Sequence, residues 1–194
     1  MGGHRFNPEK AHKLDNPERR KLMPPERILQ EFQIHPSDVV LDLGAGTGYF
    51  TLPASRMTEK EVYALDLEPR MLALLQEKVR QTEAAANVHV LQGAIENIPL
   101  ESQSVDKIIA SLVLHESDDL KKTLREMQRV LRPGGRILII EWEKQQTEEG
   151  PPLSERIAVE EMEETIRNVG MEIERRVREN GMYYLLHVKQ SHVV

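Results

Sequence analysis

One segment, Val39–Phe50, restricts the possible folds of this chain more than any other. A run of β-branched and aliphatic residues ends at Asp42, and glycines follow at positions 44, 46 and 48. This order predicts a buried strand, a tight glycine-rich turn and then a helix. Glycine tolerates positive φ angles and lets a ligand approach the main chain, while the N–H groups at a helix N-terminus point outward. The segment therefore predicts a site for a nucleotide-like cofactor.

The spacing of the glycines limits which cofactor the turn can hold. A dinucleotide-binding turn has glycines at relative positions one, three and six, but here the sixth position is Tyr49, whose bulk would crowd the helix against the strand. No Gly-Lys-Ser/Thr sequence follows, so the turn is not a P-loop. An NAD-dependent oxidoreductase is therefore a less favoured alternative, and a ligand without a phosphate group is favoured. A tight turn with no ligand would need fewer glycines.

Composition excludes several classes of protein. The chain has no cysteine, which excludes disulfides, thiolate metal sites and cysteine nucleophiles, and we expect a cytoplasmic protein without a metal site. The net charge of −6 disfavours nucleic acid as a partner. No apolar run approaches the ~20 residues that a membrane span requires. The sequence does not indicate an oligomeric state.

Apolar periodicity predicts an N-terminal arm followed by one domain. Residues 1–24 contain several prolines and no clear period, so we expect an irregular arm or lid there, and a single domain over 25–194. The expected helices begin at Pro25, cover 48–57, begin at Pro69, begin at a Ser117 cap and cover 155–169. The expected strands cover 39–43, 61–66, 88–92, 105–114, 136–142, 172–178 and 182–189.

The order of these elements predicts an α/β fold with a mostly parallel sheet. Strands that alternate with helices form parallel βαβ units. Asn180-Gly181 predicts a tight hairpin, whose two strands must be antiparallel. Ligands of such sheets bind at the carboxyl ends of the parallel strands. We therefore expect the functional residues immediately after those strands.

Asp66 ends the second expected strand, 18 residues beyond Gly48. An acid at this place can accept hydrogen bonds from both hydroxyl groups of a ribose. The alternative is that Asp66 only stabilises the N-terminus of the next helix through the helix dipole. The glycine-rich turn upstream favours ribose binding.

Five segments together resemble one protein family. Asp42–Gly48, Asp66, Gly93–Pro99, Ser104–Ile109 and Leu131–Arg136 have the order and spacing of class I S-adenosylmethionine-dependent methyltransferases. The chain is most similar to the small-molecule branch related to the ubiquinone/menaquinone-type enzymes. The resemblance implies a Rossmann-like, seven-stranded sheet with helices on both faces, S-adenosylmethionine as cofactor, and in-line methyl transfer to a small-molecule acceptor. A non-catalytic protein that binds the cofactor or acts as a scaffold is the alternative.

The resemblance also implies which residues contact the cofactor. The loop would meet its methionine and sugar parts, Asp66 its ribose, and the positions after the third strand its adenine. The family commonly has an Asp where this chain has Ala94, so one acceptor for the adenine amino group is missing, and main-chain groups or Glu96 would replace it. The expected cofactor-binding residues are Asp42, Gly44, Ala45, Gly46, Gly48, Asp66, Leu67, Met71, Ala94 and Ile95.

Catalysis by such a protein depends on positioning more than on acid–base chemistry. A general base is needed only where the acceptor carries a proton, and the candidates are His115 and Glu116 after the fourth strand. A lone histidine is explained almost as well by a structural role. The expected substrate-pocket residues are Glu141 and Trp142 after the fifth strand, and Phe6, His12 and Arg19 in the arm. A quinone-like phenol, an amine and a thiol all remain open as acceptors.

Overall fold

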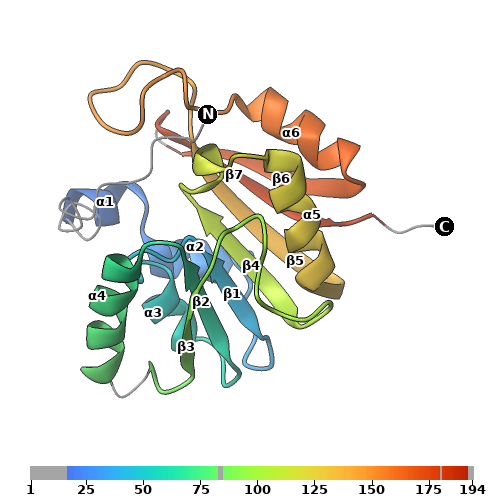
Figure 1. Cartoon of the computed structure of the whole chain (residues 1–194). Helices are drawn as coiled ribbons and strands as arrows, with labels where there is room; N and C mark the ends of the chain where they lie inside the picture. Colours follow the sequence, from blue (N-terminus) through green and yellow to red (C-terminus); the bar gives the residue numbers. More distant parts are fainter. Residues whose placement is uncertain (1–16, 83–84, 180, 192–194) are drawn as a thin grey trace.

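The computed structural model describes residues 17–82, 85–179 and 181–191. Its centre is a seven-stranded sheet in the order β3-β2-β1-β4-β5-β7-β6 (Figure 1). Strands β1 to β5 run parallel, and β7 is antiparallel to both of its neighbours, β5 and β6. The bounds are Val40–Leu43 (β1), Val62–Asp66 (β2), Val88–Gln92 (β3), Val105–Ser111 (β4), Leu131–Trp142 (β5), Met171–Glu179 (β6) and Tyr183–Gln190 (β7). This topology confirms the predicted Rossmann-like fold.

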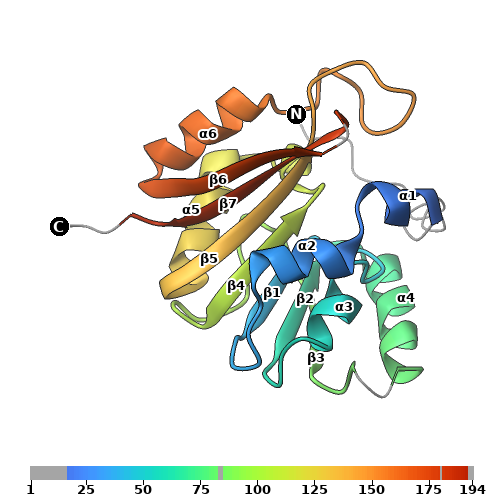
Figure 2. The ribbon, with the colours of Figure 1, turned by 180° about the vertical axis from the view of Figure 1, so that it is seen from behind.

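Helices cover both faces of the sheet. Figure 2 shows α2, α3 and α4 on one face, whereas Figure 1 shows α5 and α6 on the other. The strand period of two produces this division: in β5, Leu138 and Ile140 pack toward α2, and Ile137 and Ile139 pack toward α5 and α6. The helices are α1 (Pro17–Leu22), α2 (Pro25–Phe32), α3 (Thr51–Ser55), α4 (Pro69–Arg80), α5 (Leu120–Val130) and α6 (Val159–Asn168).

The expectation of an irregular arm up to residue 24 is wrong for its last part, because α1 is a helix. Pro17 stands at its first position, where proline is tolerated. Glu18 lies in the first turn and basic residues lie in the last turn, which suits the helix dipole. The short helix ends at Leu22, two residues before Pro24. A helix of six residues is too short to show an apolar period, so the sequence pattern does not reveal it.

Two other predicted elements are shorter than expected. The helix predicted over 48–57 covers only Thr51–Ser55, because Gly48 has a φ of +89°, outside the helical region. The strand predicted over 105–114 ends at Ser111, because Leu112 has a φ of +54° and turns the chain. A short 3₁₀ turn, η3 (Leu114–Glu116), follows. The start of α3 and the end of β4 both lie beside the expected ligand site.

The N-termini of the last two helices also differ from the predictions. Helix α5 is capped by Asp119, whose side chain accepts a hydrogen bond from the Lys122 N–H, and not by Ser117. The hydroxyl of Ser117 donates instead to Glu96. Helix α6 begins at Val159 and not at 155, because the preceding residues belong to a loop held around Arg156.

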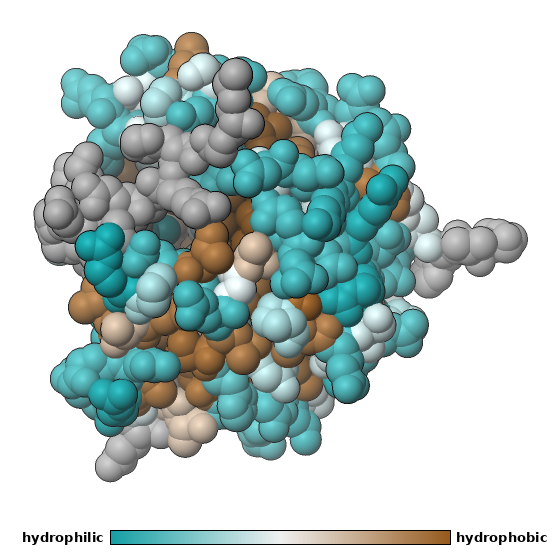
Figure 3. Space-filling model, in the orientation of Figure 1, coloured by the Kyte–Doolittle hydropathy of each residue, from teal (hydrophilic) through white to brown (hydrophobic). Residues whose placement is uncertain are grey.

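The segment 93–104 replaces a helix between β3 and β4. It carries Ile95 and Ile98 into the core that β2, β4 and α5 share. Tyr63 and Leu91 are partly buried and pack against the same core. Figure 3 shows apolar surface in this part of the molecule. In the described ranges, none of the helices combines the length and the apolar character that crossing a membrane would require.

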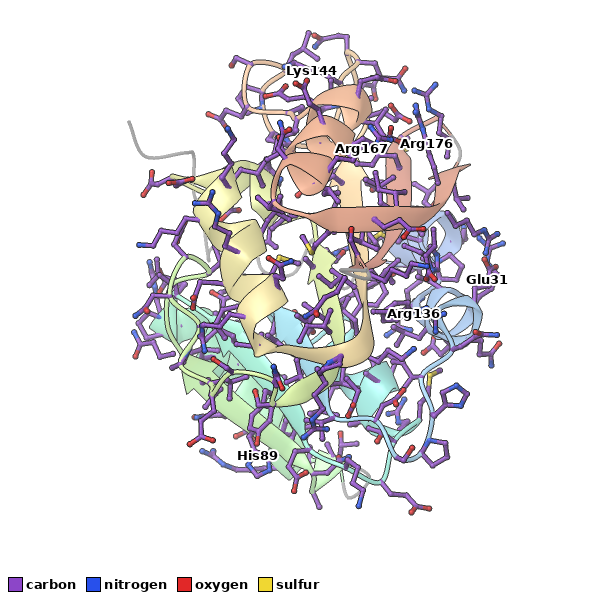
Figure 4. All side chains as sticks on the ribbon, turned by 90° about the vertical axis from the view of Figure 1, so that its right-hand side faces the viewer. Glu31, His89, Arg136, Lys144, Arg167 and Arg176 are labelled. Atoms are coloured by element: carbon purple, nitrogen blue, oxygen red, sulfur yellow. The ribbon has the colours of Figure 1, made fainter. Side chains whose placement is uncertain are left out.

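The edge strand β6 is covered with ion pairs (Figure 4). Arg176 contacts Glu160 and Glu163 of α6 at 3.0 and 3.3 Å, and Arg175 contacts Glu31 of α2 at 3.5 Å. Exposed pairs of this kind contribute little stability each. Their charges discourage pairing of this edge with a strand of another molecule.

Candidate active site

The glycine-rich loop after β1 has the backbone conformation that only glycine adopts easily. Gly44, Gly46 and Gly48 have φ angles of +74°, +54° and +89°. A Cβ on Gly44 would lie 2.3 Å from Cγ2 of Val113, so this glycine also permits the loop to touch the segment after β4. The N–H groups of Gly44 and Ala45 donate to the carbonyl of Leu65, which fixes the loop against β2.

Asp66, at the end of β2, binds this loop directly. Its Oδ2 accepts from the Gly46 N–H at 2.8 Å, and its Oδ1 accepts from the Glu68 N–H at 2.9 Å. Burial raises the pKa of the Asp66 carboxyl, and these backbone hydrogen bonds oppose that shift. A carboxylate has about four acceptor sites, so Asp66 keeps capacity for a ligand hydroxyl.

Asp42, at the end of β1, is buried beneath the same loop. Its Oδ2 accepts from the Thr51 hydroxyl at 2.6 Å. The pKa of Asp42 is raised to about 7: burial is the largest cause and the charge of Asp66 adds to it, whereas the Thr51 hydrogen bonds and Arg19 partly oppose the shift. Asp42 therefore changes charge near neutral pH.

This pKa predicts that Asp42 makes stability depend on pH. The folded chain keeps a proton that the unfolded chain releases near its ordinary pKa of 3.8, so the stabilisation is complete below that value and is lost as pH rises through about 7. Asp42→Asn mimics the protonated form and should lose less stability than the wild type between about pH 4 and 7, the range in which the folded chain is protonated at this site and the unfolded chain is not. Urea unfolding across this range measures the difference. Parallel curves for the two proteins would contradict the assignment.

The residues expected near the adenine lie around the start of α4 and the end of β3. Met71 is buried, Leu67 is 39% exposed, and Ile95 is buried. Ala94 is half-buried. The carboxylate of Glu96, a suggested substitute for the missing acid, accepts from the Ser117 hydroxyl and the Asp118 N–H, both at 3.0 Å. The main-chain groups of 94 and 95 are therefore the better candidates.

His115 and Glu141 form a buried pair where β4 and β5 end. Nδ1 of His115 lies 2.9 Å from Oε2 of Glu141, and the side chains are 6% and 1% exposed. Burial is the largest influence on the pKa of His115 and lowers it, but the charge and hydrogen bond of Glu141 oppose burial, and the net shift is upward. Glu141 thus lies beneath His115 and offers almost no surface to a pocket. Glu116 is half-buried on the same turn.

Trp142, the other residue expected to line a pocket, anchors the loop between β5 and α6. Its ring packs against Tyr183 at a centroid distance of 4.8 Å, and the Arg156 guanidinium lies 5.1 Å from its centre. Arg156 donates to four main-chain carbonyls and to the Thr147 hydroxyl. The loop lines a half-open pocket of about 240 Å³. The sequence does not reveal this role, because Arg156 stands in a strongly charged segment.

The N-terminal arm reaches the site through α1. Arg19 lies 4.1 Å from the ring centre of Tyr49, and the Tyr49 hydroxyl donates to the Met23 carbonyl at 2.7 Å. In Figure 1, α1 and the loop after β5 lie on the side of the sheet toward which β4 points. Phe6 and His12 lie outside the described residues.

The residues present fit the cofactor that the resemblance implies. At the three glycines no side chain covers the main chain of the loop. The Asp66 carboxylate can still accept hydrogen bonds from a ligand. The Ser111 hydroxyl at the end of β4 is buried and has no hydrogen-bond partner in the described part of the chain. Within those residues, no group of three or more His, Asp or Glu side chains is placed to hold a metal ion.

Comparisons with known proteins agree with this geometry. A family model described as a methyltransferase domain matches residues 41–139. A crystal structure of a SAM-dependent methyltransferase from Aquifex aeolicus superimposes with a TM-score of 0.88 and 32% identity, covering 95% of this chain and 98% of that one.

Two curated relatives are similar over a shorter part. One is the ubiquinone/menaquinone biosynthesis C-methyltransferase UbiE of Pasteurella multocida, 38% identical over 61% of this chain. The other is a malonyl-[acyl-carrier protein] O-methyltransferase of Serratia marcescens, 45% identical over 58% of this chain. The matches span less than half of the length of these relatives, 47% and 42%.

Proposed function

Since the chain belongs to the class I S-adenosylmethionine-dependent methyltransferases and uses S-adenosylmethionine as its cofactor, we propose that it methylates a small molecule with an acidic hydroxyl group, such as a phenol or an enol. The observation that carries this proposal is the His115–Glu141 pair at the carboxyl ends of β4 and β5. This pair follows Val113, whose side chain lies against Gly44 of the cofactor loop.

Each part of the site has a distinct task in this proposal. S-adenosylmethionine supplies, when bound, an electrophilic methyl group that leaves a sulfonium sulfur in line with the attacking atom. Asp42, Asp66 and the loop bind and orient the cofactor, with Leu67, Met71 and residues 94–95 at its adenine. His115 accepts the hydroxyl proton at Nε2, because Nδ1 is bound to Glu141. Glu116 remains a second candidate base.

The name of one curated relative supports this acceptor class. That relative is a ubiquinone/menaquinone biosynthesis C-methyltransferase, whereas the other is named for a malonyl acceptor. A phenolate or enolate carries negative charge on both oxygen and carbon, so one kind of deprotonated acceptor is able to react at either atom. An acceptor that is already a carboxylate would need no base.

A labelled-methyl assay with a panel of acceptors tests the proposal. The chain is incubated with methyl-labelled S-adenosylmethionine and a phenol, a carboxylic acid, an amine or a thiol. We expect label in the phenol, no label with Gly46→Asp, and a kcat about a hundredfold lower with His115→Asn. Label only in the other acceptors would refute the acceptor class. If S-adenosylhomocysteine binds but no acceptor is labelled, the protein is a non-catalytic cofactor binder.

We also propose that the N-terminal arm, of which the structure describes only residues 17–24, helps to close the acceptor pocket over the single domain 25–194. The support is the contact of Arg19 with Tyr49, next to the cofactor loop. In the same assay, a variant without residues 1–22 should lose turnover and keep its cooperative thermal unfolding. Unchanged turnover would show that the arm does not close the acceptor pocket.

A further inference from the structure

Glu141 is a buried charge whose acceptor sites are almost entirely used. Its Oε1 accepts from the N–H groups of Leu114 and His115 at 2.8 and 3.3 Å. Its Oε2 accepts from Nδ1 of His115 at 2.9 Å and from the N–H of Trp142 at 3.3 Å. A buried carboxylate is costly unless it is hydrogen-bonded. With about four acceptor sites on a carboxylate, Glu141 meets this requirement entirely through the end of β5 and the turn η3.

The chain reaches Glu141 through a strained turn. Leu112 has a left-handed φ of +54°, which a bulky side chain rarely adopts. Its N–H donates to the Ile140 carbonyl at 2.8 Å, so the turn is tied to β5 at the residue before Glu141. Strain of this kind persists only where surrounding contacts require it. Glu141 supplies two of these contacts, because it binds the first two N–H groups of η3.

The same carboxylate decides which imidazole nitrogen carries the proton. An acceptor at 2.9 Å keeps the proton on Nδ1, so Nε2 of the neutral ring is the basic nitrogen. Three carboxylates act on His115: Glu141 from β5, Glu116 from its own turn and Glu155 from the loop before α6. Only Glu141 has a hydrogen bond to the ring among the residues that the structure describes.

We propose that Glu141 is a positioning residue that holds His115 in the Nδ1–H tautomer, with Nε2 ready to accept the proton of the methyl acceptor. The proton moves from the acceptor hydroxyl to Nε2, the acceptor oxygen keeps the electron pair, and the resulting imidazolium is balanced by Glu141. The use of this base rests on the proposed function. The tautomer and the basicity of His115 are properties of the free protein, so they are measurable without any substrate.

Nuclear magnetic resonance of ¹⁵N-histidine-labelled protein without ligands tests this proposal. His115→Asn assigns the resonance among the seven histidines. We expect the wild type to show the Nδ1–H tautomer and a pKa above the ordinary value of 6.5. In Glu141→Gln the carboxylate is replaced by an amide of similar shape, and we expect a lower pKa and loss of the single tautomer. A wild-type spectrum with the proton on Nε2 would overturn the proposal, whether or not the variant folds.

Glu155→Gln is the matched control, because it removes another carboxylate that acts on His115 without a hydrogen bond to the ring. It should keep the Nδ1–H tautomer. With a phenol acceptor, Glu141→Gln should lower kcat about a hundredfold and leave the affinity for S-adenosylhomocysteine unchanged. If no acceptor is methylated by the wild type, the proposed function fails, but the tautomer result stands. If Glu141→Gln keeps both the wild-type tautomer and the wild-type pKa, Glu141 has no positioning role.

Discussion

Replacing Gly44 by alanine should weaken the binding of S-adenosylhomocysteine more than tenfold and lower the free energy of unfolding by about 2–5 kcal/mol. Two costs combine in this change. A side chain at a φ of +74° is strained, and its Cβ would lie 2.3 Å from Cγ2 of Val113. The loop must then move away from the segment after β4, and the cofactor contacts move with it. Calorimetric titration and urea unfolding measure the two effects.

Gly134 provides a matched control for the backbone strain alone. Its φ is +81°, and no heavy atom lies within 4 Å of an added Cβ. Gly134→Ala should therefore cost only the left-handed strain, about 1–2 kcal/mol, without loss of cofactor affinity. Adding Val113→Ala to Gly44→Ala should recover part of the lost stability. Equal effects of Gly44→Ala and Gly134→Ala would show that the contact with Val113 is unimportant.

Asp66→Asn should weaken the binding of S-adenosylhomocysteine about ten- to a hundredfold, because one hydrogen bond to a charged group contributes about 1.5–3 kcal/mol. The amide has one acceptor oxygen instead of two, and the Gly46 and Glu68 N–H groups each bind one oxygen of the carboxylate. Glu68→Gln is the control, since it removes a neighbouring carboxylate that is bonded to Arg70 and not to the loop. Affinity of Asp66→Asn equal to that of the control would exclude Asp66 from the ribose site.

The strands, the glycine-rich loop and Asp66 could be predicted from the sequence because their signals are local. A buried parallel strand is a short apolar run, and the alternate glycines of 44–48 are needed for the backbone angles that the structure contains. The antiparallel hairpin of β6 and β7 was predictable for the same reason, since a tight turn allows only one strand direction. Their positions place the cofactor loop beside Asp66.

The relation between His115 and Glu141 could not be predicted, because it joins residues 26 positions apart. Glu141 lies near the end of an apolar strand, where the sequence predicts a pocket residue, but its carboxylate turns toward backbone N–H groups that only the folded chain brings near. The left-handed Leu112, which directs η3 to this carboxylate, has no sequence signal either, because leucine rarely adopts that conformation. The role of Arg156 could not be predicted for the same reason, because it donates to main-chain carbonyls that only the folded loop brings near it.

A crystal structure of the chain with S-adenosylhomocysteine tests the central claim most directly. The account predicts the ligand along the loop 44–48, with its ribose hydroxyls within hydrogen-bonding distance of the Asp66 carboxylate and its sulfur facing the turn η3. Binding at any other part of the molecule, or a ribose that does not contact Asp66, would contradict it.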